Sequence, residues 1–376
     1  MDVTVNKVVI HELIKEQHRD PLPLNPMKKV IPSKNEVVVK LVAGILELYG
    51  KRNNSAQYGV FKKGPTAGSF PREFDSYYKL KLPSEKEFLE ISEVALGELY
   101  RLAKSNPASS GGYILIADIE SEGGRFLLVA MLKKKDGIRL NQYLIPEELE
   151  QIDINSIHQA AKLNIQKYGL FVNAGDEEKD EMNYLSFVTP SSNKAATGYF
   201  VEALGCSKGT ASSKATDTLI RESVAFFRDK PELKESRFDF KDELIRYLHD
   251  CVDNGRSVKL SEVDLIARKY FPGSEIEETD AFSEALYTKL NSEINSVPKE
   301  FPANSLVLKR HTHIKYKSDS WQILFDKDLL GVTADSEIQY VVDRTGKAND
   351  SLVLSNLPAD FRQKIIDELR DKGIEV

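Results

Sequence analysis

The sequence predicts an α+β fold, and two patterns carry this prediction. Amphipathic helices are indicated by apolar residues at helical spacing behind capping signals, as in the segment where Glu87 follows Ser84 by three residues. Antiparallel strands are indicated by short apolar runs joined by acidic and glycine residues, as in residues 113–119 and 125–132. We therefore expect an N-terminal α+β unit with a mainly antiparallel sheet, a central helical unit and a small C-terminal α+β unit.

The N-terminal unit is assigned to residues 1–188. It opens with a strand over residues 3–10, and the prolines of the connector over residues 21–32 exclude a helix there. A helix should then start at Ser33, because Glu36 completes a capping box and apolar residues follow at helical period.

Residues 53–81 show no clear period and are predicted to form a long loop with short ordered pieces. The helix after Ser84 should continue until Pro107 excludes it. Its buried stripe is expected to consist of Phe88, Ile91, Ala95, Leu99 and Leu102. Apolar and polar residues alternate over residues 161–166, which predicts a half-exposed strand.

The central helical region is assigned to residues 189–299, after a charged run over 176–181 that predicts a solvated loop and a strand over 184–188. Gly205 should divide its first helical segment, residues 193–229, in two. Further helices are expected over residues 236–253, 261–271 and 279–295. The C-terminal region, residues 300–376, should contain strands over 312–317, 321–325 and 352–354 and a helix after Pro358.

Composition places the chain among ordinary globular proteins, with 41% hydrophobic and 29% charged residues. No apolar run approaches the ~20 residues that span a bilayer, and no signal-peptide pattern opens the sequence, so we expect a cytoplasmic protein without a membrane partner. Its two cysteines, Cys206 and Cys251, are expected to be reduced. The net charge of -6 argues against a uniformly basic surface, so any DNA contact should come from local patches.

Motifs for catalysis are weak. The glycines and lysine around Gly205 do not have the order of a phosphate-binding loop, and a helix break explains them better. Asp118, Glu120 and Glu122, with Lys133 nearby, are the nearest set for a metal-dependent nuclease, but the expected Glu-x-Lys spacing is absent and a hairpin turn explains the acids better.

His311 and His313 share a strand face in principle, but no further ligand accompanies them, and Cys206 is interpreted as a small buried residue. We therefore predict no catalytic residues, no metal and no cofactor, and expect a protein that works by binding and not as an enzyme.

Basic residues offer a better candidate site. The most concentrated group lies at the start of the C-terminal region, where phosphate-directed charge accompanies Tyr316. A second group lies around Gly205, where hydroxyls over residues 207–218 would also suit phosphates. The predicted DNA-binding residues are Lys309, Arg310, Lys315 and Lys317 in the first group, and Lys194, Lys208, Lys214 and Arg221 in the second. The alternative for each group is a lysine-rich surface that prevents aggregation.

The stretch YFVEALGCS at residues 199–207 resembles the bacterial nucleoid-associated protein family of the NdpA/YejK type. The similarity continues through Lys214, Thr216, Leu219 and residues 226–227, and it includes residues 8–13, 58–61, 111–115, 126–132, 329–331 and 352–369 in the same order. The resemblance implies a cytoplasmic protein of the nucleoid that binds double-stranded DNA. It also implies DNA-processing partners, such as a type II topoisomerase, and it supplies no catalytic residues.

Three functions remain open at this point. The first is a non-enzymatic nucleoid-associated protein that contacts DNA through the basic groups. The second is an adaptor that recruits DNA-processing proteins to the nucleoid, which the net acidity favours. The third is a metal-dependent nuclease built around Asp118. A homodimer is compatible with each of them.

Overall fold

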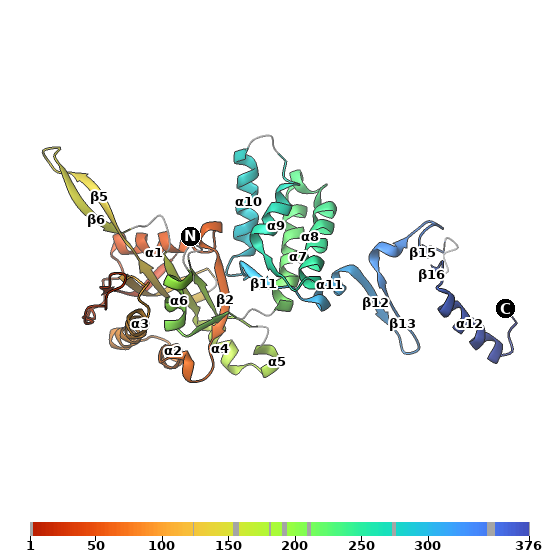
Figure 1. Cartoon of the computed structure of the whole chain (residues 1–376), viewed down its shortest axis with the longest axis horizontal. Helices are drawn as coiled ribbons and strands as arrows, with labels where there is room; N and C mark the ends of the chain where they lie inside the picture. Colours follow the sequence, from red (N-terminus) through yellow and green to blue (C-terminus); the bar gives the residue numbers. More distant parts are fainter. Residues whose placement is uncertain are drawn as a thin grey trace. The chain divides into compact units, whose positions relative to one another are not determined.

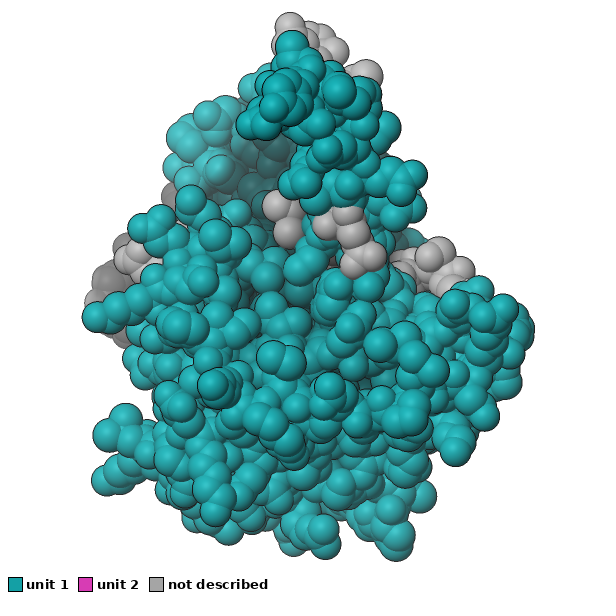
Figure 2. Space-filling view, turned by 90° about the vertical axis from the view of Figure 1, so that its left-hand side faces the viewer, with its two compact units in different colours: residues 1–304 teal, residues 305–376 magenta. Residues whose placement is uncertain are grey.

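The computed structural model describes residues 3–122, 124–152, 158–179, 182–189, 194–208, 212–272, 276–343 and 350–375. The chain forms two compact units, Met1–Asn304 and Ser305–Val376. Figure 1 shows the elements of both units, and one face of the first unit is seen in Figure 2. The division into three parts at residues 188 and 299 stays a prediction.

A seven-stranded sheet organises the first unit, and every pairing in it is antiparallel. The hairpin expected near residue 120 lies inside this sheet and confirms the antiparallel prediction. In spatial order the strands are β1 (Thr4–Leu13), β3 (Gly112–Ser121), β4 (Gly124–Leu132), β7 (Gln159–Asn164), β8 (Leu185–Val188), β2 (Ala56–Phe61) and β9 (Cys206–Lys208).

Helices cover both faces of this sheet, so its strands carry apolar residues on both sides (Figure 1). One face packs against α2 (Phe70–Tyr78), α3 (Glu85–Ser105), α4 (Ile165–Asn173) and α6 (Lys194–Ala203). The other face packs against α1 (Glu36–Leu48). In β3, Ile114 and Ile116 join the first core layer, whereas Leu115 and Ala117 join the second.

The capping prediction at Ser84 is confirmed. The backbone N–H of Glu87 donates to Ser84 Oγ (3.2 Å), and the Ser84 N–H donates to Glu87 Oε2 (2.6 Å). The prediction at Ser33 is wrong by two residues, because Asn35 caps α1 and accepts from the N–H groups of Val37 and Val38. Both side chains are good helix caps, so sequence alone could not choose between them.

The prediction for residues 53–81 is right about short ordered pieces but wrong about a long loop, since this segment supplies strand β2 and helix α2 to the core. Phe70, Phe74 and Tyr77 recur at helical spacing and are buried, but their flanking glycines and prolines obscured the period. The half-exposed strand is also wrong in its exposure. Every residue of β7 is buried, including Lys162. The charged run contains a short helix, α5 (Asp176–Lys179), instead of a loop.

Aromatic packing joins the later helices of this unit. The rings of Phe227 and Phe240 stack with centroids 4.1 Å apart, and Phe271 stacks on Phe227 at 5.7 Å. The helices are α7 (Ser212–Asp229), α8 (Arg237–Asp253), α9 (Leu260–Arg268) and α10 (Ile276–Leu290), with a small sheet of β10 (Ser257–Lys259) and β11 (Glu300–Pro302). They confirm the helices expected from the sequence, although α9 and α10 end several residues earlier.

The second unit is smaller and mixes short strands with two helices (Figure 1). It contains α11 (Ser305–Thr312), the hairpin β12 (His313–Lys317) and β13 (Gln322–Asp326), the strands β14 (Leu330–Gly331), β15 (Ile338–Val341) and β16 (Ser351–Leu354), and α12 (Ala359–Asp371). The strands and the final helix agree with the α+β prediction for this region.

A buried histidine makes the stability of the first unit sensitive to acid. His11 is fully buried, its Nδ1 accepts from the Met27 N–H (3.1 Å), and its Nε2 lies 3.1 Å from Ser92 Oγ. Burial lowers the pKa of His11 to about 4 from an ordinary 6.5. Neutral His11 therefore stabilises the fold above pH 6.5, and this contribution is lost as the pH falls towards 4.

We expect the free energy of unfolding to fall by up to about 3 kcal/mol from this residue as the pH drops from 6.5 to 4. His11→Gln keeps hydrogen-bonding groups but does not titrate. Its unfolding should therefore take up about one proton fewer in this pH range, so its free energy of unfolding should fall less steeply as the pH drops. Urea denaturation of both proteins between pH 7.5 and 4.5 measures the difference. Equal pH slopes would contradict the assignment.

Candidate nucleic-acid interface

The first predicted basic group lies in α11 and the β12–β13 hairpin of the second unit, which we call the basic segment (residues 305–327). Lys315 and Lys317 are two residues apart in β12 and therefore share one face of the hairpin. Tyr316 points to the other face, where its ring lies 5.3 Å from that of Trp321. Both aromatic side chains are more than half exposed.

Lys309 and Arg310 lie in the last turn of α11, just before the strand that was expected to start at residue 312. This helical start also separates His311 from His313, which opens β12, so the two rings do not share one strand face. Lys327, which the sequence reading overlooked, donates to the His311 carbonyl (2.8 Å) and so adds its charge to the end of this helix. Its acidic neighbours Asp326 and Asp328 concealed it.

The four predicted cations of the basic segment are all exposed. Within the described parts of the chain, no carboxylate lies within 4 Å of any of them. The segment contains five Lys and Arg residues against two Asp residues, whereas the whole chain has a net charge of -6. Lys309, Arg310, Lys315 and Lys317 thus lie in one contiguous segment as exposed cations without a carboxylate within 4 Å among the described residues, and phosphate binding requires such available charge.

The second predicted group is less favourable. Lys214 and Arg221 lie seven residues apart in α7 and therefore on one exposed stripe. Arg221, however, already contacts Glu222 Oε1 (3.1 Å) and Asp217 Oδ2 (3.9 Å). The side chains of Lys194 and Lys208 lie outside the described residues.

Two of the hydroxyls in this second group do not face solvent. Thr216 and Thr218 are buried, and Thr216 Oγ1 donates to the Ser212 carbonyl (2.7 Å). Gly205 ends α6 with a φ of 64°, which confirms the helix break, and β9 follows directly. Cys206 is buried as predicted, and burial raises the pKa of its thiol to about 12, so it is not a reactive thiolate.

The nuclease candidate does not assemble. Asp118 is fully buried and is held by Arg125, whose Nε lies 2.9 Å from Oδ1 and whose Nη2 lies 2.5 Å from Oδ2. Tyr77 donates to Asp118 Oδ2 (2.5 Å), and burial together with this carboxylate raises the pKa of Tyr77 well above its ordinary value. Lys133 sits at the opposite end of the β3–β4 pair and donates to Ser110 Oγ (2.6 Å).

No group of three or more His, Cys, Asp and Glu residues suited to a metal ion occurs among the residues that the structure describes. The described helices also include none that is both long and apolar enough to cross a bilayer.

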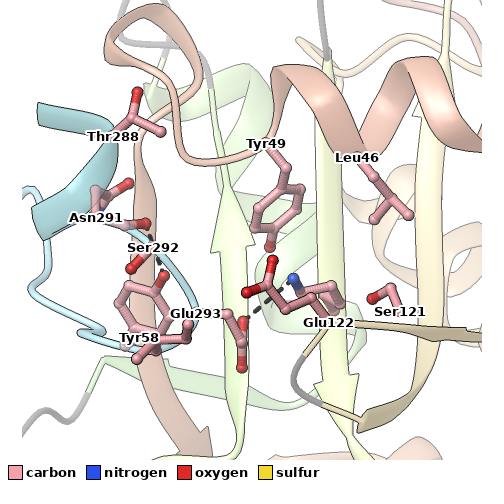
Figure 3. Close-up of a pocket in the computed structure, with 11 residues that line it drawn as sticks. Leu46, Tyr49, Tyr58, Ser121, Glu122, Thr288, Asn291, Ser292 and Glu293 are labelled. Carbon is pink, nitrogen blue, oxygen red and sulfur yellow. Dashed lines mark hydrogen bonds and ion pairs between the residues drawn. The ribbon is translucent and has the colours of Figure 1, made fainter. Parts of the chain in front are cut away.

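A pocket of about 130 Å³ lies where the loop after α10 meets the sheet (Figure 3). Lys162 Nζ lies 3.2 Å from Glu293 Oε2 and 4.6 Å from the centre of the Phe126 ring, while Lys167 Nζ lies 3.3 Å from Glu293 Oε1. The Glu122 carboxylate and the Tyr49 ring also border the pocket (Figure 3). The buried Lys162 is already paired with Glu293, so we interpret this pocket as a structural contact between the sheet and the loop after α10 and not as a ligand site.

Fold and surface together define an α+β protein with a concentrated, unneutralised basic segment. A family model described as nucleoid-associated protein YejK matches residues 9–362, which cover most of both compact units. The chain belongs to this nucleoid-associated protein family.

Relatives in Pseudomonas match along nearly their whole length. A nucleoid-associated protein of Pseudomonas entomophila is 22% identical over 366 residues, which cover 97% of this chain and 98% of the relative. One from Pseudomonas paraeruginosa is 23% identical over 361 residues and 96% of each chain. The resemblance stated from the sequence is thereby confirmed, and a nucleoid-associated role follows from the family.

Proposed function

We propose that this chain is a non-enzymatic, cytoplasmic nucleoid-associated protein that binds double-stranded DNA through the basic segment. The observation that carries the proposal is the exposed group of Lys309, Arg310, Lys315 and Lys317, without a carboxylate within 4 Å among the described residues. Such cations contact backbone phosphates and release counterions, which gives affinity without base specificity. Lys214 and Arg221, with Lys194 and Lys208, form a secondary contact in this proposal.

Replacing the four primary cations by glutamine should weaken duplex binding at least tenfold at low salt. It should also make the slope of log affinity against log salt shallower by up to about 3.6, because each phosphate contact contributes about 0.9. Fluorescence anisotropy with a labelled duplex between 50 and 300 mM NaCl measures both quantities.

The matched control replaces four other exposed cations, Lys40, Lys104, Lys234 and Lys364, by glutamine, which gives the same change in net charge. This control should retain most of the affinity and the wild-type slope. Equal effects of the two variants would show that only net charge matters and would contradict the assignment of the basic segment. Duplex DNA incubated with the protein and Mg²⁺ or Mn²⁺ should remain intact, and cleavage would contradict the non-enzymatic proposal.

The adaptor role is the second candidate, and the exposed apolar side chains of the second unit favour it. Leu352 and Leu354 on β16 and Phe361 on α12 are between 42% and 48% exposed. The partner would be a DNA-processing protein such as a type II topoisomerase, as the family resemblance implies. Co-purification that persists after nuclease treatment would support direct recruitment, whereas its loss would leave DNA as the link.

A further inference from the structure

A two-stranded arm extends from the sheet of the first unit. It consists of β5 (Lys134–Leu140) and β6 (Pro146–Ile152), which pair with each other and project as a ribbon (Figure 1). Its base is fixed, because Lys133 Nζ donates to Ser110 Oγ and Lys134 Nζ lies 3.1 Å from Glu12 Oε1. A two-stranded ribbon alone is only marginally stable in water, so a contact is expected to stabilise it.

The tip of the arm presents large apolar side chains to solvent. Five of them are more than half exposed within eight residues: Ile138, Leu140, Tyr143, Leu144 and Ile145. The turn is preformed, because Asn141 Oδ1 accepts from the N–H groups of Tyr143 (2.9 Å) and Ile145 (3.1 Å). Leu144 has a φ of 63°, a region that normally favours glycine, yet its side chain is 76% exposed. The tip is thus a shaped apolar surface that the described residues leave uncovered.

Charge near the tip argues against nucleic acid as that partner. Arg139 is the one Lys or Arg residue between positions 136 and 148, and its Nη2 lies 3.3 Å from Glu147 Oε2. Glu148 is exposed, and no Lys or Arg of the described chain lies within 4 Å of it. Ribbons that enter DNA grooves need positive flanks, so an apolar tip flanked by carboxylate fits a protein surface with the opposite charge.

The first unit carries a surface of that kind. A groove of about 570 Å³ lies between residues 30–34 and the start of α3. Ile31 of this segment forms an antiparallel bridge to Val8 of β1. Val30, Ile31, Pro32 and Pro83 supply its apolar lining. Lys7 and Lys34 also line it, and neither has a carboxylate within 4 Å among the described residues. Glu85 is the single acid of the lining.

We propose that the arm tip of one copy docks in this groove of a second copy. Tyr143, Leu144 and Ile145 cover the apolar lining, and Glu148 pairs with Lys7 and Lys34. A two-fold arrangement makes this contact twice, since each copy offers one arm and one groove. The acidic residue at the arm tip and the lysines of the groove belong to the same sequence, so a second copy of this chain supplies a partner of complementary charge.

Light scattering coupled to size-exclusion chromatography tests the proposal on the full chain, at 10 to 100 µM protein. The wild type should show twice the chain mass of 42.4 kDa. The variant Tyr143→Ser/Leu144→Gly/Ile145→Ser should show the single-chain mass, and it should keep the wild-type circular dichroism and melting temperature because these side chains are exposed. A wild type that remains a single chain at 100 µM would overturn the proposal.

Charge reversal provides a test that unfolding cannot imitate. Glu148→Lys and Lys7→Glu/Lys34→Glu should each be single chains, because like charges then meet in both contacts. Their mixture should regain the double mass, since one contact is wild type and the other has both charges reversed. The controls Glu47→Lys and Lys40→Glu/Lys104→Glu change exposed residues elsewhere and should remain double. Failure of the mixture to associate would overturn the proposal.

Cysteine cross-linking locates the contact. Leu144→Cys and Pro32→Cys proteins, mixed and mildly oxidised, should form a disulfide between two copies, and the native Cys206 and Cys251 are buried. With both substitutions in one chain, a disulfide confined to that chain at high protein concentration would overturn the proposal. The proposal would also be overturned if the tip variant lost DNA affinity but still had twice the single-chain mass. The tip would then contact DNA and not a second copy.

Discussion

Replacing Arg125 by methionine should lower the free energy of unfolding by about 3–5 kcal/mol. The Arg125 side chain is 12% exposed, and its Nε and Nη2 make three hydrogen bonds to the fully buried Asp118. Its Nη1 also donates to the carbonyls of Leu80 and Lys81 (3.1 and 3.2 Å). Methionine fills a similar space but leaves a buried carboxylate without its cation and two carbonyls without their donor.

Urea denaturation followed by far-ultraviolet circular dichroism measures this loss. Arg139→Met is the matched control, because Arg139 also faces a carboxylate across a strand pair but is 61% exposed, and exposed pairs contribute less than about 1 kcal/mol. The double variant Asp118→Asn/Arg125→Met should be less destabilised than Arg125→Met, since the buried charge is removed with its partner. If Arg125→Met is no more destabilising than Arg139→Met, the buried Arg125–Asp118 pair does not stabilise the fold more than an exposed pair does.

Gly205→Ala should destabilise the first unit by about 2–4 kcal/mol. Gly205 has a φ of 64°, where a side chain is strained. A Cβ atom there would lie 2.4 Å from the Ala67 carbonyl oxygen and 2.6 Å from Pro71 Cγ. The backbone is also fixed at this point, because the Lys62 N–H donates to the Gly205 carbonyl (2.7 Å). Backbone strain at this φ and the close contacts of the added Cβ therefore both destabilise the variant.

Gly198→Ala provides the opposite expectation within the same segment. Gly198 lies inside α6, and an added Cβ would have open space around it. The substitution should stabilise the protein by about 0.5–1 kcal/mol, because alanine loses less backbone entropy in a helix. Thermal melting should give a lower melting temperature for Gly205→Ala and a higher one for Gly198→Ala than for the wild type. Shifts of the same sign would contradict the role assigned to the positive φ of Gly205.

Local signals explain which elements were predictable. Ser84 and Glu87 form a cap within four residues, and the β3–β4 hairpin needs only neighbouring strands and a short turn. Strand β2 has no such signal. Its partners β8 and β9 lie more than 120 residues later, so only tertiary pairing reveals it. Lys162 appeared to mark an exposed face, but Glu293 and the Phe126 ring allow its burial.

The candidate site shows the same division. Exposure of the basic segment was predictable, because four cations in nine residues rarely enter a core. The helical position of Lys309 and Arg310 was not predicted, since a short helix leads directly into β12. Asp118 looked like a metal ligand by residue type. Only the tertiary contacts with Arg125 on the neighbouring strand and Tyr77 on α2 show that its carboxylate is already bound.

The position of β2 also affects how the chain folds during synthesis. Residues 56–61 leave the ribosome early, but their partner β9 ends at residue 208. At 5–20 residues per second, about 150 intervening residues take roughly 7–30 s to be made. For most of that time, until β8 (Leu185–Val188) emerges, β2 has neither of its two neighbouring strands, although Tyr58 and Phe61 are buried in the finished fold. We therefore expect residues 56–61 to stay unpaired, and accessible to other apolar surfaces, until these late strands of the sheet emerge.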